Sequence, residues 1–170
     1  MPAPIATSVV KGDPVVHFLV LAVLLYLGWY VLFEFLIHPD GSLDRMAIDS
    51  LMSISGGILE LLGYELIPEP ANAENLRTLG IQGATLLWIG DACNGIGLFA
   101  VYLIFLIAYP GPVKHKIWFG LLGLVTIHLI NALRVAALCI IVKYDYELLN
   151  FNHDFTFYVV VYGWVFLLWA

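Results

Sequence analysis

The chain contains several long and almost uncharged apolar segments, and this feature constrains its fold more than any other. A helix that crosses a lipid bilayer needs about 20 consecutive apolar residues. We predict four such helices, at residues 15–37, 95–109, 117–142 and 153–170. Soluble packing does not explain these segments, because only 12% of the sequence is charged, whereas soluble domains are about 25% charged. The sequence therefore predicts one domain, residues 1–170, with the fold of an all-α integral membrane helical bundle.

A polar region, residues 38–91, separates the first two predicted spans. Within it, apolar residues recur at helical spacing over residues 43–62, which predicts an amphipathic helix. Ser42 is expected to be its N-cap and Gly63 to end it. The side of this helix that faces water is expected to carry three acidic residues, Asp44, Asp49 and Glu60. We expect the helix to lie on the external membrane surface.

The second half of the polar region favours strands. Residues 76–89 contain several β-branched and aromatic residues, and the pair Gln82-Gly83 between them is typical of a turn. This pattern predicts a short β-hairpin whose second arm leads into Asp91.

Lysines in the short loops indicate the orientation. Lys114 and Lys116 lie between the second and third predicted spans, and Lys11 precedes the first span. Lysine and arginine concentrate in cytoplasmic loops. The N-terminus is therefore expected in the cytoplasm, and residues 38–91 are expected outside.

Composition also excludes some classes of function. The formal net charge is −6 and no basic tract is present, so nucleic acid is not an expected partner. The lipid bilayer is an expected partner because of the long apolar segments. The two cysteines, Cys93 and Cys139, are too few for a disulfide framework or a structural zinc site. No His-Glu-x-x-His sequence occurs, and neither a metal nor another cofactor is predicted.

Three residues that are distant in sequence are expected at one membrane depth. Cys93 precedes the second span at its outer end, and His153 begins the fourth span at the same face. Arg134 lies 17 residues into the third span, which is about 26 Å along a helix. A small bundle could therefore bring Cys93, Arg134 and His153 into contact.

The chemistry of these three residues fits acyl transfer. A cysteine thiolate is a nucleophile toward a carbonyl carbon. Arg134 would stabilise the oxyanion or position the substrate, and His153 would carry the proton to and from the reacting groups. Each residue also has an ordinary structural explanation: Cys93 as a small buried apolar side chain, Arg134 as a cation that reaches the interface, and His153 as an interfacial polar residue.

Neighbouring polar residues are candidates for supporting roles. Asn131 lies one turn before Arg134, and it would orient the arginine, donate to the oxyanion or bond to another helix. Asp91 would pair with Arg134 or His153, or simply end the hairpin. His128 is expected to form an interhelical hydrogen bond, and Cys139 is expected to be structural because it lies on another face of the same helix.

Two short motifs and a histidine give the chain a resemblance to a known family. The run Gly90-Asp91-Ala92-Cys93-Asn94-Gly95-Ile96-Gly97 opens one span, Asn131-Ala132-Leu133-Arg134 lies in the next, and His153 begins a later helix. This order resembles the exosortase/archaeosortase family, which pairs a cysteine motif, often Cys-Asn-Gly, with Asn-x-x-Arg and a later histidine.

The resemblance implies a membrane-embedded cysteine transpeptidase or protease. Its substrates would be exported, membrane-anchored proteins with a C-terminal sorting signal, cleaved at the outer face of a bacterial cytoplasmic (inner) membrane. Cys93 would be the nucleophile, Arg134 the transition-state stabiliser and His153 the acid/base, with Asn94 in the cysteine motif. The alternative is a non-enzymatic membrane subunit that binds or orients an exported protein or a lipid-linked chain. The oligomeric state and the recognition motif stay open.

Overall fold

The computed structural model describes residues 13–68, 77–151 and 157–169, most of which are helical. Two of these helices are long and apolar enough to cross a bilayer, Pro14–Ile37 and Val113–Tyr144. Ile96–Ala108 and Val159–Leu168 are apolar but shorter. The described residues thus contain two helices of full spanning length where four spans were predicted, and the other two predicted spans correspond to these shorter helices.

The first helix, α1 (Pro14–Leu32), continues into a π-helical turn, η1 (Phe33–Ile37). Asp13 caps it, because its carboxylate accepts a hydrogen bond of 2.9 Å from the backbone N–H of Val15. No residue of α1 is buried, although the helix contacts α3. This exposed apolar surface is the kind that lipid covers in a membrane protein.

The second helix, α2 (Ser42–Leu61), matches the predicted amphipathic helix in position. Gly63, at φ +85°, ends it as predicted. The backbone N–H groups of Gly63 and Tyr64 donate to the carbonyls of Glu60 and Leu59, which is the Schellman pattern of a helix end. The predicted N-cap is wrong: Ser42 is already helical, and its backbone N–H donates to the Asp40 carboxylate at 3.3 Å.

The buried face of α2 also differs from the prediction. It consists of Asp44, Ile48, Leu51, Ser55, Gly56 and Leu59, and it packs against the long helix α4 (Val113–Tyr144). Asp44, which was expected to face water, is only 2% exposed. The sequence analysis assigned Asp44 to the side that faces water because its side chain is charged. In the structure, its carboxylate has polar partners inside the protein.

Two polar side chains join α2 to α4. The Ser55 hydroxyl lies 2.7 Å from the Leu51 carbonyl oxygen and 3.0 Å from that of Ala132. The Ser50 hydroxyl lies 3.0 Å from Nε2 of His128, which confirms the predicted interhelical hydrogen bond of His128.

The predicted hairpin is present but short. Strands β1 (Thr78–Leu79) and β2 (Leu87–Trp88) pair antiparallel, with Thr78 opposite Trp88. Gln82 and Gly83 lie in the turn between them, where the Ala84 N–H donates to the Ile81 carbonyl. The chain after α2 adds a bridge that was not predicted, between Leu66 and Ile81.

The hydrophobic core lies where α2, the hairpin and the C-terminal half of α4 meet. It contains Ile48, Leu51, Leu59, Leu79, Ile81, Ile89, Ala132, Val135, Ala136 and Cys139. Full burial of one Leu or Ile side chain stabilises a fold by about 1.5–3 kcal/mol. Cys139 is 2% exposed in this core, in agreement with its predicted structural role.

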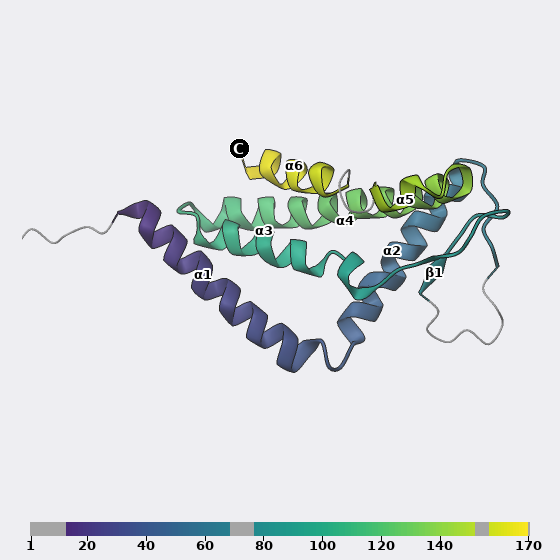
Figure 1. The fold of residues 1–170 in the computed structure, drawn as a ribbon. Coiled ribbons are helices and arrows are strands. Elements are labelled where there is room, and N and C mark those ends of the chain that lie inside the picture. Colours follow the sequence, from purple (N-terminus) through teal and green to yellow (C-terminus); the bar gives the residue numbers. More distant parts are fainter. Residues whose placement is uncertain (1–12, 69–76, 152–156, 170) are drawn as a thin grey trace, which may run out of the picture.

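The apolar helices gather at the other end of α4. Helix α3 (Ile96–Ala108) and helix α6 (Phe157–Trp169) both contact α4, and they flank it in Figure 1. A short helix, α5 (Leu148–Phe151), follows α4.

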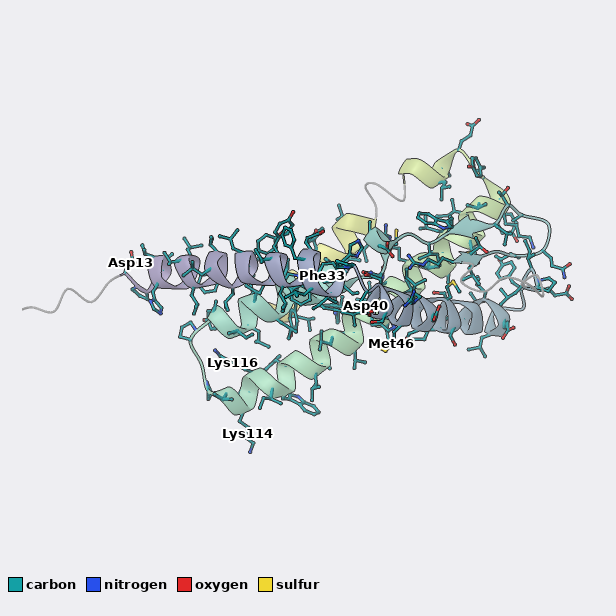
Figure 2. The ribbon with its side chains drawn as sticks, turned by 90° about the horizontal axis from the view of Figure 1, so that it is seen from below. Asp13, Phe33, Asp40, Met46, Lys114 and Lys116 are labelled. Carbon is teal, nitrogen blue, oxygen red and sulfur yellow. The ribbon has the colours of Figure 1, made fainter. Side chains whose placement is uncertain are left out.

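In Figure 1, α1 and α2 form the arms of a V that meet at the turn after η1. Figure 2 shows Asp13, Lys114 and Lys116 toward one end of the molecule and Asp40 farther along it.

Candidate functional site

A cavity of about 400 Å³ lies where η1, the start of α3 and the middle of α4 meet. Five of the six predicted site residues line it, namely Asp91, Cys93, Asn94, Asn131 and Arg134. The sixth, His153, lies outside the described residues. The structure therefore brings the cysteine motif and the Asn-x-x-Arg motif to one cavity, and it does not test the histidine.

Cys93 is held in a tight turn that leads into α3. It ends a 3-10 turn, η2 (Asp91–Cys93), and its thiol is partly buried. The side-chain oxygen of Asn94 then accepts the Ile96 backbone N–H at 2.8 Å and starts α3. Gly95 follows at φ +84°, a conformation that glycine adopts at little cost. The Cys-Asn-Gly sequence thus specifies the turn that presents the thiol to the cavity.

Asn131 fixes this turn from α4. Its side-chain nitrogen donates a hydrogen bond of 2.8 Å to the backbone carbonyl of Cys93, and the residue is 1% exposed. A Cβ atom at Gly95 would come within 3.2 Å of the same nitrogen, so glycine leaves room for the bond. The sequence analysis left several roles open for Asn131. Among these, the structure shows a hydrogen bond to another helical segment, because Asn131 lies in α4 and Cys93 in η2.

Arg134 lies one turn after Asn131 on α4 and lines the same cavity as Cys93. It is partly buried. A guanidinium here offers fixed hydrogen-bond donors and a permanent positive charge to a group in the cavity. Cys93 and Arg134 are 41 residues apart in sequence, and their shared cavity is the spatial relationship that the predicted chemistry requires.

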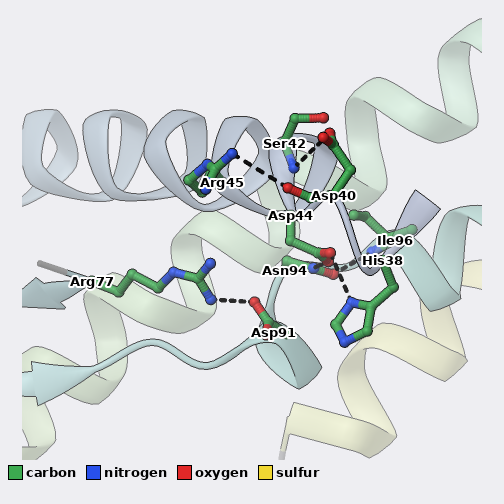
Figure 3. Close-up of polar contacts among 9 residues, drawn as sticks. All are labelled: His38, Asp40, Ser42, Asp44, Arg45, Arg77, Asp91, Asn94 and Ile96. Atoms are coloured by element: carbon green, nitrogen blue, oxygen red, sulfur yellow. Dashed lines mark hydrogen bonds and ion pairs between the residues drawn. The ribbon is translucent and has the colours of Figure 1, made fainter. Parts of the chain in front are cut away.

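Asp91 has a partner that the sequence analysis did not anticipate. Its carboxylate forms an ion pair with Arg77, which precedes β1. The sequence analysis considered Arg134 or His153 as its partner, or a role only in ending the hairpin. The two side chains are 43% and 22% exposed, so the ion pair is partly screened by water. Figure 3 shows this contact next to the cysteine turn. Asp91 therefore ties the turn to the hairpin.

A second polar cluster in the cavity was also missed. One carboxylate oxygen of the buried Asp44 accepts a hydrogen bond of 2.6 Å from the Asn94 side-chain nitrogen, and the other lies 2.9 Å from Nδ1 of His38 (Figure 3). The hydrogen bond to Asp44 raises the pKa of His38 above its ordinary value. The helical spacing of Asp44 with Ile48 and Leu51 was the one sequence signal that placed it on the buried face.

The charges of the cavity are mixed. Carboxylates come from Glu34, Asp44 and Asp91, and cationic or titratable groups come from His38 and Arg134. Across residues 13–68, 77–151 and 157–169, no three His, Cys, Asp or Glu side chains are grouped so as to hold a metal ion. The arrangement combines a thiol, a guanidinium and an imidazole, which are groups that serve nucleophilic attack, charge stabilisation and proton transfer.

Comparison with known proteins identifies a family. Residues 5–170 match the model of the family described as transmembrane exosortase (Exosortase_EpsH). No curated protein and no solved structure shows significant similarity to the chain.

Proposed function

The chain belongs to the transmembrane exosortase family, and from that premise we propose that it is a membrane-embedded cysteine transpeptidase or protease. Its substrates are exported proteins with a C-terminal sorting signal that includes a transmembrane helix. The observation that carries the proposal is the common cavity of Cys93 and Arg134.

The proposed reaction proceeds through a thioacyl intermediate. The Cys93 thiolate attacks the carbonyl carbon of the scissile peptide, and Arg134 stabilises the negative charge that develops on the oxygen. His153 donates a proton to the departing amine when the C–N bond breaks. It then accepts a proton from an incoming amine or water, which displaces Cys93 from the acyl group.

Helix length supports an active site at the outer face of the membrane. Arg134 lies 18 residues after Lys116, which corresponds to about 27 Å of helix. The hydrocarbon core of a bilayer is about 30 Å thick. If Lys116 marks the cytoplasmic boundary, the cavity lies close to the outer boundary of a bacterial inner membrane. The core built by α2 and the hairpin then lies outside.

An apolar groove beside the cavity supports a membrane-anchored substrate. It measures about 830 Å³, and side chains from α1, α2, α3 and α4 line it. Ile96 lines both the groove and the Cys93 cavity. We therefore place the transmembrane helix of the substrate in this groove, because its outer end would then lead directly to Cys93.

Substrate cleavage in membranes tests the proposal. The Cys93→Ala variant is expected to abolish cleavage of a co-expressed substrate that carries the sorting signal. Cys139→Ala is the matched control, since it removes the other thiol, which lies in the structural core. Undiminished cleavage by Cys93→Ala would favour the non-enzymatic binding subunit instead.

A further inference from the structure

The cysteine cavity contains a histidine that the proposed reaction does not use. Resting on the proposed cysteine mechanism, we infer that His38 is a further catalytic residue that takes the proton of the Cys93 thiol, and that Asp44 is its positioning residue. His38 follows η1, 55 residues before Cys93 in sequence, and it lines the same cavity. Its side chain is 40% exposed, so the ring is open to a reacting group.

A chain of hydrogen bonds connects His38 to the cysteine turn. Asp44 accepts from the His38 ring with one oxygen and from the Asn94 amide with the other. Asn94 directly follows Cys93. Both contacts are visible in Figure 3, where His38 and Asn94 approach Asp44 together. The turn that carries the thiol and the residue that carries the imidazole are thus held by one carboxylate.

Asp44 also determines which ring nitrogen acts as the base. When Nδ1 of His38 donates its proton to the carboxylate, Nε2 of the neutral ring is the acceptor. An aspartate plays the same orienting part behind the histidine of serine proteases. Burial of a carboxylate at 2% exposure is unfavourable unless partners compensate it, so a site used only for packing would favour an apolar residue at position 44.

The charged surroundings of His38 favour proton uptake. Glu34 in η1, Asp44 in α2 and Asp91 in η2 all raise the pKa of His38, with the Asp44 hydrogen bond as the largest cause. Arg134 from α4 is the cation that lines the same cavity. A general base works best with a pKa close to the working pH.

The two histidines then divide the proton transfers. In acylation the S–H bond of Cys93 breaks, its proton moves to His38, and the sulfur–carbon bond forms; the C–N bond breaks while protonated His153 gives its proton to the amine. In deacylation the incoming amine or water loses a proton to His153 as it bonds to the carbonyl carbon. The sulfur–carbon bond then breaks, and the sulfur recovers its proton from His38. Both histidines return to their starting states.

The rate of Cys93 alkylation by iodoacetamide tests this assignment without substrate. The thiolate is the form that iodoacetamide attacks. In a Cys139→Ala background, His38→Gln is expected to slow alkylation at pH 7 about tenfold, with the two rates converging above pH 10. Asp44→Asn is expected to slow it in the same direction. His115→Gln, in the first turn of α4 and outside the Cys93 cavity, is the control and should alkylate like the parent protein.

Imidazole rescue separates proton transfer from a structural effect. Added imidazole should raise the alkylation rate of His38→Gly and leave that of His115→Gly unchanged. If His38→Gln alkylates like His115→Gln at every pH, or if imidazole does not rescue His38→Gly, the role of His38 is wrong. The proposed function fails by a different result, namely cleavage that survives Cys93→Ala, which this assay does not measure.

Discussion

The side-chain amide of Asn131 donates a 2.8 Å hydrogen bond to the backbone carbonyl of Cys93. This bond joins the Asn-x-x-Arg helix to the turn that carries the thiol. It therefore fixes the position of Cys93 relative to Arg134, which lies one turn further along α4. The two motifs act as one structural unit, although 37 residues separate Asn94 from Asn131.

Loss of the Asn131 bond should reduce both catalysis and stability. We expect Asn131→Ala to lower kcat of substrate cleavage by about 10- to 100-fold, because small errors in the position of a nucleophile are costly. The free energy of unfolding should fall by about 1–3 kcal/mol, the usual cost of leaving a buried group unsatisfied. Leu133→Ala, on an exposed position of the same helix, is the control. Cleavage by Asn131→Ala within twofold of the parent protein would contradict this role.

Close approach of α3 and α4 depends on Gly123. The ring of the buried Tyr102 occupies the space that a Cβ atom at Gly123 would need, and the Tyr102 hydroxyl donates to the Phe119 carbonyl at 2.7 Å. Gly123→Ala is therefore expected to separate the helices and lower the thermal unfolding midpoint in detergent. Gly28→Ala is the matched control, since a Cβ there meets nothing within 4 Å. Equal midpoints for the two variants would show that Tyr102 moves aside freely.

The contact between His38 and Asp44 predicts a pH-dependent stability. The pKa of His38 is raised in the folded protein, so the contact stabilises the fold fully at pH values below the ordinary histidine pKa of about 6.5. This stabilisation is lost as the pH rises through the raised value. The unfolding midpoint of the parent protein should therefore fall between pH 6 and pH 8.5 by more than that of His38→Gln. Parallel pH profiles for the two proteins would rule out the linkage.

Blocking the apolar groove should affect only membrane-anchored substrates. Ala47 of α2 lines the groove, and Ala47→Trp would fill part of it. We expect a KM at least tenfold higher for a substrate with its transmembrane helix, and an unchanged kcat/KM for a short soluble peptide that contains the cleavage site. Val23→Trp, on an exposed part of α1 away from the groove, is the control. A similar loss on both substrates would place the substrate helix elsewhere.

Residue types and helical periodicity predicted the features that depend on residues close together in the sequence. The hairpin turn at Gln82-Gly83 and the helix end at Gly63 follow from local preferences of the backbone, and both are present. Of the four predicted apolar spans, two are helices of full spanning length and two correspond to shorter apolar helices in the described residues. The common depth of Cys93 and Arg134 followed from helix rise and loop charge. Their shared cavity agrees with that expectation.

Pairings between distant polar residues were not predictable in this way. Asp44 was assigned to water because it is charged, yet His38 and Asn94, which lie 6 and 50 residues from it, make its burial possible. Arg77 and Asp91 likewise pair across the hairpin. Periodicity identifies a buried face but not the partner that a buried charge will find, because that partner depends on how the helices cross.

The central claim is that Cys93 forms a thioacyl intermediate with the substrate. Purified protein can be incubated with a membrane-anchored substrate, quenched in acid and digested for mass spectrometry. We predict a mass increase on the peptide that contains Cys93, equal to the acyl portion of the substrate and removed by hydroxylamine, and no such adduct on Cys139. Cleaved substrate without an adduct on Cys93, in a protein whose Cys93→Ala variant cleaves equally fast, would contradict the account.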